Sequence, residues 1–113
     1  MQTDDTSQIP MTVSQANAVQ AAERYLAVSA FSRSGLIQQL SSAHGEGYPR
    51  ADAVYAVDHL SVDWNEQAVR AAKQHLADWP FSREDLIQRL KARWGDGFTH
   101  DQAIYGVSHT NIW

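Results

Sequence analysis

Apolar side chains recur along this chain at intervals of three and four residues, which places them on one face of an α-helix. In the first half of the chain these positions are Val19, Ala22, Leu26, Leu36, Ile37 and Leu40. No segment alternates between apolar and polar residues for long enough to predict a strand. The pattern therefore predicts an all-α protein.

The second half of the chain repeats the first at an offset of 50 positions, without a gap. Between Ala18 and Leu60, 19 of 43 positions carry the same residue as the position 50 places later, where average residue frequencies would give roughly three. We predict two tandem units, residues 14–61 and 62–113, behind a flexible polar leader of residues 1–13. Because a unit of this size buries a modest share of its surface, we expect the two to pack together.

Each unit is predicted to contain three helices. The expected helices are Gln15–Val28, one beginning after Ser32 and Arg50–Leu60 in the first unit, and Trp64–Ala77, one beginning after Ser82 and His100–His109 in the second. The last two helices of each unit are joined by a short glycine-bearing turn and resemble a helix-turn-helix. The predicted fold is thus two tandem three-helix, helix-turn-helix-like repeats.

Cap and turn residues account for most of the remaining identities. Ser32 and Ser82 are natural N-caps, and Thr99 with Gln102 forms a capping-box pattern. Pro49 stands where Thr99 stands in the second unit, and its lack of a side-chain oxygen predicts a weaker helix start. Gly-x-Gly segments at residues 45–47 and 95–97 are predicted to close the second helix of each unit through a left-handed conformation.

Composition restricts the chemistry. The formal charge of −4 disfavours a nucleic-acid partner, whose phosphates require Lys and Arg, and mildly favours a basic one. There is no cysteine, which excludes disulfides and thiolate chemistry. No run of 18 apolar residues occurs that could span a membrane, and residues 1–12 lack the basic and apolar regions of a signal peptide.

Several segments together resemble the repeat of Ltp-type host cell surface-exposed lipoproteins. They are Val-Asp-Trp-Asn-Glu-Gln-Ala at residues 62–68, Phe-Ser-Arg-x-x-Leu-Ile-x-x-Leu from Phe31 and from Phe81, and Ala-x-Tyr-x-Val from Ala53 and from Ala103. The resemblance covers both units. It implies a cell-surface protein held by an N-terminal lipid anchor that this chain lacks. It also implies superinfection exclusion, in which prophage-encoded members block DNA injection by engaging a phage tape measure protein.

The sequence departs from the family pattern in three respects. It has no lipobox cysteine, the link at residues 41–47 is longer than in the streptococcal-type repeats, and Gln38 and Gln88 stand where an acidic residue is common. The phage role is therefore an implication of the resemblance and is not tied to particular residues.

The residues themselves do not indicate an enzyme. The histidines, His44, His59, His75, His100 and His109, lack the i, i+4 spacing of metal ligands. The two N-cap serines are explained as caps, and there is no nucleophile elbow or phosphate-binding loop. We expect no catalytic residue, bound metal or cofactor.

Two further functions stay open at this point. The first is a small helix-turn-helix regulator that binds nucleic acid. It is favoured by four basic residues in the second unit and opposed by two acidic neighbours; these are Arg83, Arg89, Lys91 and Arg93, and Glu84 and Asp85. The second is a structural or adhesive envelope protein with no phage role.

The preferred hypothesis is a non-enzymatic, extracytoplasmic domain that binds a protein, in the sharpest case a basic phage tape measure protein. Acidic residues would meet that partner and exposed tryptophans would anchor it, because Trp is enriched at binding hot spots. The candidate partner-binding residues are Asp52, Asp58, Glu66, Asp96, Asp101, Trp79 and Trp113. No nucleic-acid partner is expected in this interpretation.

Overall fold

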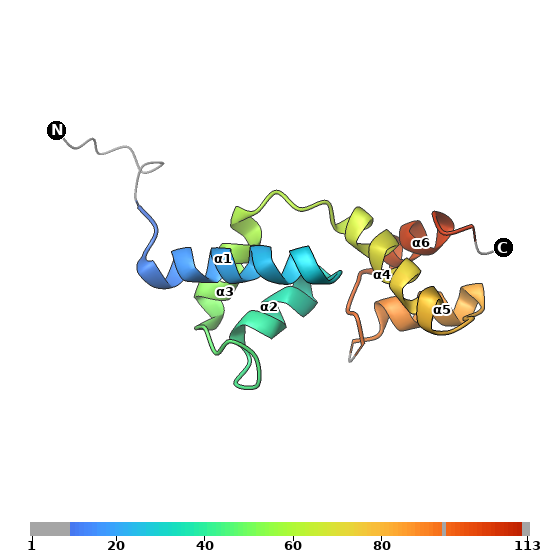
Figure 1. Ribbon diagram of the computed structural model, residues 1–113, viewed down its shortest axis with the longest axis horizontal. Coiled ribbons are helices and arrows are strands. Elements are labelled where there is room, and N and C mark those ends of the chain that lie inside the picture. The colour runs from blue at the N-terminus through green and yellow to red at the C-terminus, as the bar shows by residue number, and fades with distance from the viewer. Residues whose placement is uncertain (1–9, 94, 112–113) are drawn as a thin grey trace.

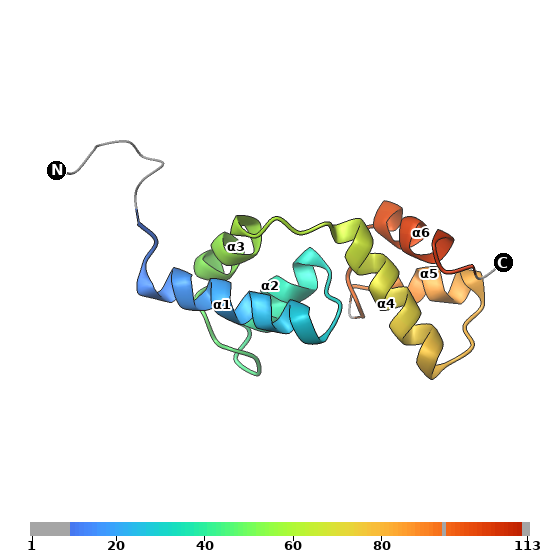
Figure 2. The same ribbon diagram turned by 45° about the horizontal axis from the view of Figure 1, so that its top comes forward.

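A computed structural model describes residues 10–93 and 95–111 of the chain. This part contains six helices, α1 (Val13–Val28), α2 (Arg33–Ser41), α3 (Arg50–His59), α4 (Trp64–Asp78), α5 (Arg83–Lys91) and α6 (His100–Ser108). Helices α1 to α3 form one unit and α4 to α6 form a second unit beside it (Figures 1 and 2). The predicted all-α fold with tandem three-helix repeats is confirmed, and we call the two units the first and second repeat.

Most helices begin at a residue whose side chain caps the first turn. Ser32 and Ser82 accept the backbone N–H three residues later, at 2.9 and 3.1 Å, and Thr99 forms the predicted capping box with Gln102. Pro49 makes no side-chain cap, as expected. An unpredicted capping box of Thr12 and Gln15 starts α1 two residues before the expected Gln15.

The glycine turns differ from the expectation. Helices α2 and α5 end in extended residues, Ser42 and Ala92, and not at a glycine. Within these two turns the described glycines with positive φ values are Gly47 and Gly97, at 70° and 77°, so the left-handed conformation lies at the end of each turn. The prediction that these glycines close the helices is therefore wrong. Their conformation instead reverses the chain after each helix has ended.

Each repeat has its own hydrophobic core. The first core is built by Ala18, Ala22, Leu36, Ile37, Leu40, Ala53, Ala56 and Val57. The second is built by Ala68, Ala71, Ala72, Leu86, Ile87, Leu90, Phe98, Ala103 and Val107. Two residues cross the boundary, since Ala30 packs against the second core and Trp64 against the first. Burial of a large aliphatic side chain contributes about 1.5–3 kcal/mol. Because nearly all the buried residues of each core come from one repeat, each core stabilises mainly its own repeat.

An ion pair on the surface joins α2 to α3 in the first repeat. The Arg33 guanidinium donates to both carboxylate oxygens of Asp58 at 2.8 Å. These hydrogen bonds lower the pKa of Asp58 and raise that of Arg33. About half of each side chain is exposed, so solvent screens the pair and its contribution is small.

We expect Asp58→Asn to lower the free energy of unfolding by about 0.2–1 kcal/mol at pH 7. Because the folded-state pKa of Asp58 lies below its value of 3.8 in an unfolded chain, this contribution is present above that pH. It is lost as the pH falls through the lowered folded-state pKa. Urea denaturation at pH 7 and pH 2.5 measures the difference, with the exposed Asp101→Asn as control. A difference between wild type and Asp58→Asn that does not shrink as the pH falls from 7 to 2.5 would contradict the assignment.

Candidate protein-binding surfaces

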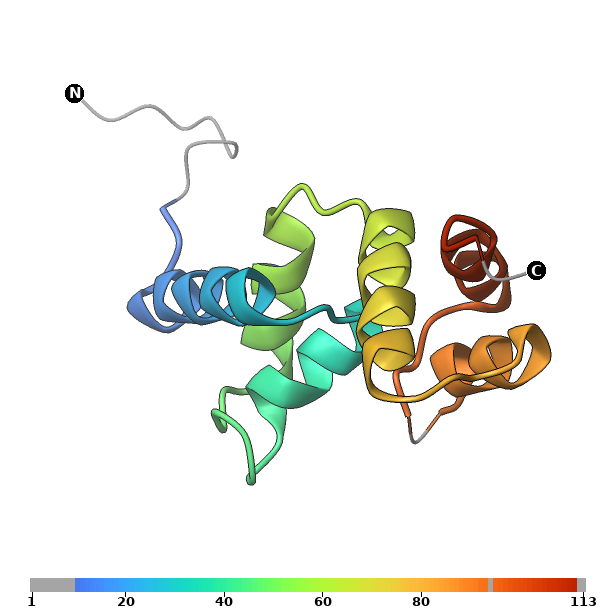
Figure 3. The same cartoon turned by 45° about the vertical axis from the view of Figure 1, so that its right-hand side comes forward.

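The two repeats meet along α4, which faces the first repeat while α5 and α6 lie on its far side (Figure 3). The Arg70 guanidinium donates to the backbone carbonyl of Leu26 at 3.1 Å and to the Gln67 amide oxygen at 3.3 Å. That amide oxygen also accepts the backbone N–H of Phe31 at 3.2 Å. Two side chains of α4 thus form hydrogen bonds to the backbone where the chain turns from α1 into α2. We call this segment, residues 26–35, the α1–α2 corner.

A second set of hydrogen bonds joins the start of α2 to the turn after α5. The Ser32 hydroxyl donates to the backbone carbonyl of Asp96 at 2.5 Å, and the Ser34 hydroxyl donates to that of Gly97 at 2.9 Å. Ser32 is only 2% exposed, so its hydroxyl needs the Asp96 carbonyl as acceptor and the Gly35 N–H as donor to offset the loss of water. The contacts fix the two repeats relative to each other.

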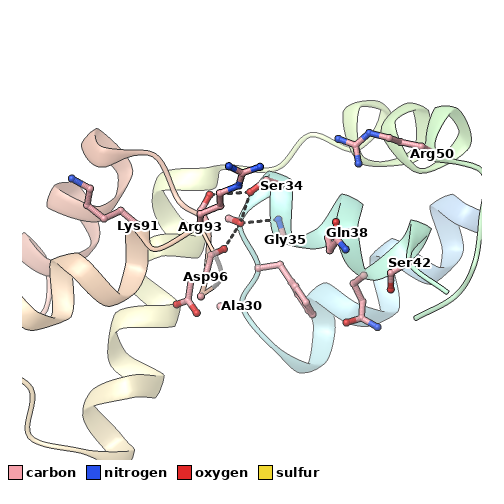
Figure 4. Close-up of a pocket in the computed structure, with 14 residues that line it drawn as sticks. Ala30, Ser34, Gly35, Gln38, Ser42, Arg50, Lys91, Arg93 and Asp96 are labelled. Atoms are coloured by element: carbon pink, nitrogen blue, oxygen red, sulfur yellow. Dashed lines mark hydrogen bonds between the residues drawn. The ribbon is translucent and has the colours of Figure 1, made fainter. Parts of the chain in front are cut away.

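A groove of about 820 Å³ runs between the repeats beside these hydrogen bonds. Its lining is mostly serine, glutamine and glycine, with three basic residues at its edges. Arg50 comes from the first repeat, and Lys91 and Arg93 come from the second (Figure 4). The Lys91 ammonium also donates to His100 Nδ1 at 3.0 Å. The groove is therefore a polar surface with local positive charge on an acidic protein.

A smaller hollow of about 530 Å³ lies on the first repeat along α1. It is lined by Asn17, Gln20, Ala21, Arg24, Tyr25, Val28, Glu46 and Tyr48. The Tyr25 hydroxyl donates to the Glu46 carboxylate at 2.5 Å, and this hydrogen bond is the main cause of a raised pKa at Tyr25. We call this surface the α1 hollow.

The Tyr25–Glu46 contact has a counterpart in the second repeat. Fifty positions later, His75 Nε2 lies 2.7 Å from the carboxylate of Asp96. Each of these two rings also packs edge-on with a phenylalanine at the equivalent position, Phe31 with Tyr25 and Phe81 with His75. Different residues thus tie the glycine turn to the first helix in both repeats.

The predicted acidic residues differ in their availability. Asp52 accepts the Ser14 hydroxyl at 2.6 Å, Asp58 is paired with Arg33 and Asp96 is paired with His75. Glu66 and Asp101 are exposed in the first turns of α4 and α6. The structure places these five carboxylates on α3, α4, α6 and the turn after α5, so they do not form one compact cluster.

The exposed apolar residues include one of the two predicted tryptophans. Trp79 is 63% exposed, whereas Trp113 lies outside the described residues. Val13 and Val28, each 78% exposed, and Tyr105, at 38%, were not predicted. Val28 follows the apolar positions Val19, Ala22 and Leu26 along α1, and an apolar residue at that place in the sequence does not indicate an exposed side chain. A role in binding stays a prediction for each of these residues.

The described residues contain no group of three or more His, Cys, Asp or Glu side chains placed to hold a metal ion. Their helices include none that is both long and apolar enough to cross a membrane. His109, one of the histidines considered above, stacks on Tyr105 with ring centres 4.0 Å apart, and His59 stacks on Tyr55 at 5.7 Å. These histidines have structural contacts at the ends of α3 and α6.

Comparison with known proteins connects both repeats to one family. The family model described as host cell surface-exposed lipoprotein matches residues 14–60 and 63–110. A solved structure of Ltp, a superinfection exclusion protein from the Streptococcus thermophilus temperate phage TP-J34, is 27% identical, with a TM-score of 0.81. The match covers 90% of this chain and 100% of that one, while no curated protein sequence matches. The chain belongs to the family of host cell surface-exposed lipoproteins.

Proposed function

We propose that this chain is the partner-binding part of a superinfection exclusion protein. In this proposal it is held at the cell surface by a lipid anchor, binds the tape measure protein of an incoming phage and thereby blocks DNA injection. The observation that carries the proposal is the similarity of both repeats to the exclusion protein Ltp over the whole of that solved chain. The activity is binding, and no catalytic step is needed.

Charge and exposed aromatic area support a protein partner. The chain carries a formal charge of −4, and Glu66 and Asp101 are exposed. Trp79 offers a large exposed apolar surface. Electrostatic attraction would then raise the rate of encounter with a basic segment, and burial of aromatic area would supply affinity.

The proposed function predicts protection from infection. Cells that display this chain through a lipid anchor should be infected by a sensitive phage with an efficiency reduced at least about tenfold, while phage adsorption is unchanged. Plating assays and adsorption assays on the same cells separate a block in injection from a block in attachment. Unchanged plating at a verified surface amount would refute the function.

Binding to a purified tape measure fragment should depend on charge. We expect roughly tenfold weaker binding when salt rises from about 50 to 500 mM, because exposed charges are screened beyond a few ångströms. The double variant Glu66→Lys and Asp101→Lys should weaken binding by a similar factor at low salt. Glu23→Lys with Asp78→Lys is the control, since it makes the same change in net charge at other exposed positions. Equal losses in both double variants would show that only net charge matters.

A further inference from the structure

The α1 hollow has a counterpart in the second repeat, and there the same surface is an interface. Asn17 and Gln20 line the hollow, and the residues 50 positions later are Gln67 and Arg70. Gln67 and Arg70 are the two α4 side chains that hold the backbone of the α1–α2 corner. One repeat therefore uses this surface to bind a helical corner, and the other repeat presents it unused.

Burial differs between the two copies accordingly. Ala71 and Phe98 in the second repeat are 4% and 3% exposed. Their counterparts in the hollow, Ala21 and Tyr48, are only half-buried. At the edge of the hollow, Val28 is exposed, as is its counterpart Asp78, so the difference lies in the centre of the surface. The described part of the chain thus leaves this surface of the first repeat open to solvent.

The corner bound in the second repeat shows what such a surface accepts. It offers a backbone carbonyl at the end of a helix, at Leu26, and a backbone N–H, at Phe31. Between them, Ala30 packs against the core of the second repeat. The following helix begins with small residues, Ser34 and Gly35, which allow close approach to the glycine turn. The ligand is therefore the small-residue corner of a helical hairpin.

The hollow retains side chains suited to the same task. The Gln20 amide nitrogen can donate to a helix-terminal carbonyl as Arg70 does, and the Asn17 amide oxygen can accept a backbone N–H as Gln67 does. Ala21 is identical to Ala71 and leaves room for a small side chain. We propose that the α1 hollow binds the corner of a helical hairpin in the partner protein. This inference rests on the proposed function and names the surface that the partner contacts.

A second copy of this chain would offer its α4–α5 corner, because its α1–α2 corner is already bound by its own second repeat. At the positions of Ser34 and Gly35 the second repeat has Glu84 and Asp85. A Cβ atom at position 35 would lie 3.0 Å from the Ser32 hydroxyl oxygen and 3.3 Å from the Asp96 carbonyl oxygen. A glutamate at position 34 would bring a carboxylate toward a carbonyl and could not donate a hydrogen bond. The acidic start of α5 therefore opposes head-to-tail association, and a partner with small residues fits better.

An extended chain tests the fit directly. A second copy of residues 12–61 is inserted ahead of Thr12, which keeps the offset of 50 positions and holds a small-residue corner beside the hollow. Because Ala21 packs in part against the first core, Ala21→Arg should lower the Tm of both chains, and we expect the loss in the extended chain to exceed that in the ordinary chain by about 5 °C or more. Ala27→Arg, at an exposed α1 position outside the hollow, should be small in both. Equal effects of Ala21→Arg in the two chains would overturn the proposal.

Phage exclusion tests the same surface with its natural partner. We expect Ala21→Arg and the milder Gln20→Glu to reduce protection at least about tenfold at an unchanged surface amount, whereas Ala27→Arg should protect like wild type. Full protection by both hollow variants would overturn the inference and leave the proposed function intact. A wild-type chain that gives no protection would instead refute the proposed function, and the extended-chain comparison would still decide whether the hollow accepts a corner.

Discussion

Replacement of Leu86 by alanine is expected to lower the free energy of unfolding by about 2–5 kcal/mol. Leu86 is fully buried and packs in the second core. Alanine would remove its transfer free energy and leave a cavity that the surrounding α-helices fill only in part. Since domains of this size are stable by about 5–15 kcal/mol, the loss is a large share of the total. Urea denaturation followed by far-ultraviolet circular dichroism measures it.

The first repeat supplies the matched comparison. Leu36 is the counterpart of Leu86 and is also fully buried, so Leu36→Ala should give a loss of similar size. Gln38→Ala, at an exposed position of α2, should change the free energy of unfolding by less than about 0.5 kcal/mol. A loss below 1 kcal/mol at either leucine would show that its side chain is not closely packed.

Helix positions and cores could be predicted from the sequence because they depend on local signals. The spacing of Leu36, Ile37 and Leu40 specifies a buried stripe, and all three are indeed buried. Ser82 and Thr99 cap helices through neighbours only three residues away. Such contacts are set by residues close in the chain, so the pattern alone is sufficient. Helix α1 begins two residues before its predicted start because Thr12 and Gln15 form a capping box there.

The arrangement of the repeats could not be predicted from the same signals. Ser32 and Ser82 occupy equivalent positions, yet Ser32 is buried and bonded to the other repeat whereas Ser82 is exposed. The distinguishing information lies in their neighbours, Ser34 and Gly35 against Glu84 and Asp85. Small residues at the start of α2 and acidic residues at the start of α5 agree with the burial of α2 by the other repeat. This difference can be interpreted only when the structure shows that the start of α2 contacts the turn after α5.

The candidate site shows the same limit. Sequence could identify acidic residues but not their partners, and Asp58 and Asp96 are each paired within the chain. The α1 hollow could not be predicted from local sequence patterns because its lining combines residues of α1 with Glu46 and Tyr48, which follow α2 and lie more than 15 positions away in the chain. Its signal was present in the repeat comparison, where Asn17 and Gln20 correspond to Gln67 and Arg70. Only the structure shows that the latter two bind a helical corner.

A close backbone approach between two helices distinguishes the second repeat from the first. A Cβ atom at Gly106 in α6 would lie 2.7 Å from the backbone carbonyl of Ala68 in α4 and 2.9 Å from its Cβ atom. The equivalent residue in the first repeat is Ala56, which is fully buried between α3 and its neighbours. Helices α4 and α6 thus pack at a contact that only glycine allows, whereas the first repeat accommodates a methyl group there.

Gly106→Ala is therefore expected to destabilise the protein, although alanine is the better helix former. Higher helix propensity would contribute up to about 1 kcal/mol in favour of alanine. The methyl group would force α4 and α6 apart, and such overpacking costs typically about 1–3 kcal/mol. Because the clash is with backbone, which cannot rotate away, we expect a net loss of about 1–2 kcal/mol in urea denaturation. In the first repeat Ala56→Gly should also destabilise, through a lost methyl contact and lower propensity. Stabilisation by Gly106→Ala would mean that the two helices can separate at little cost, and that the backbone contact does not define the second repeat.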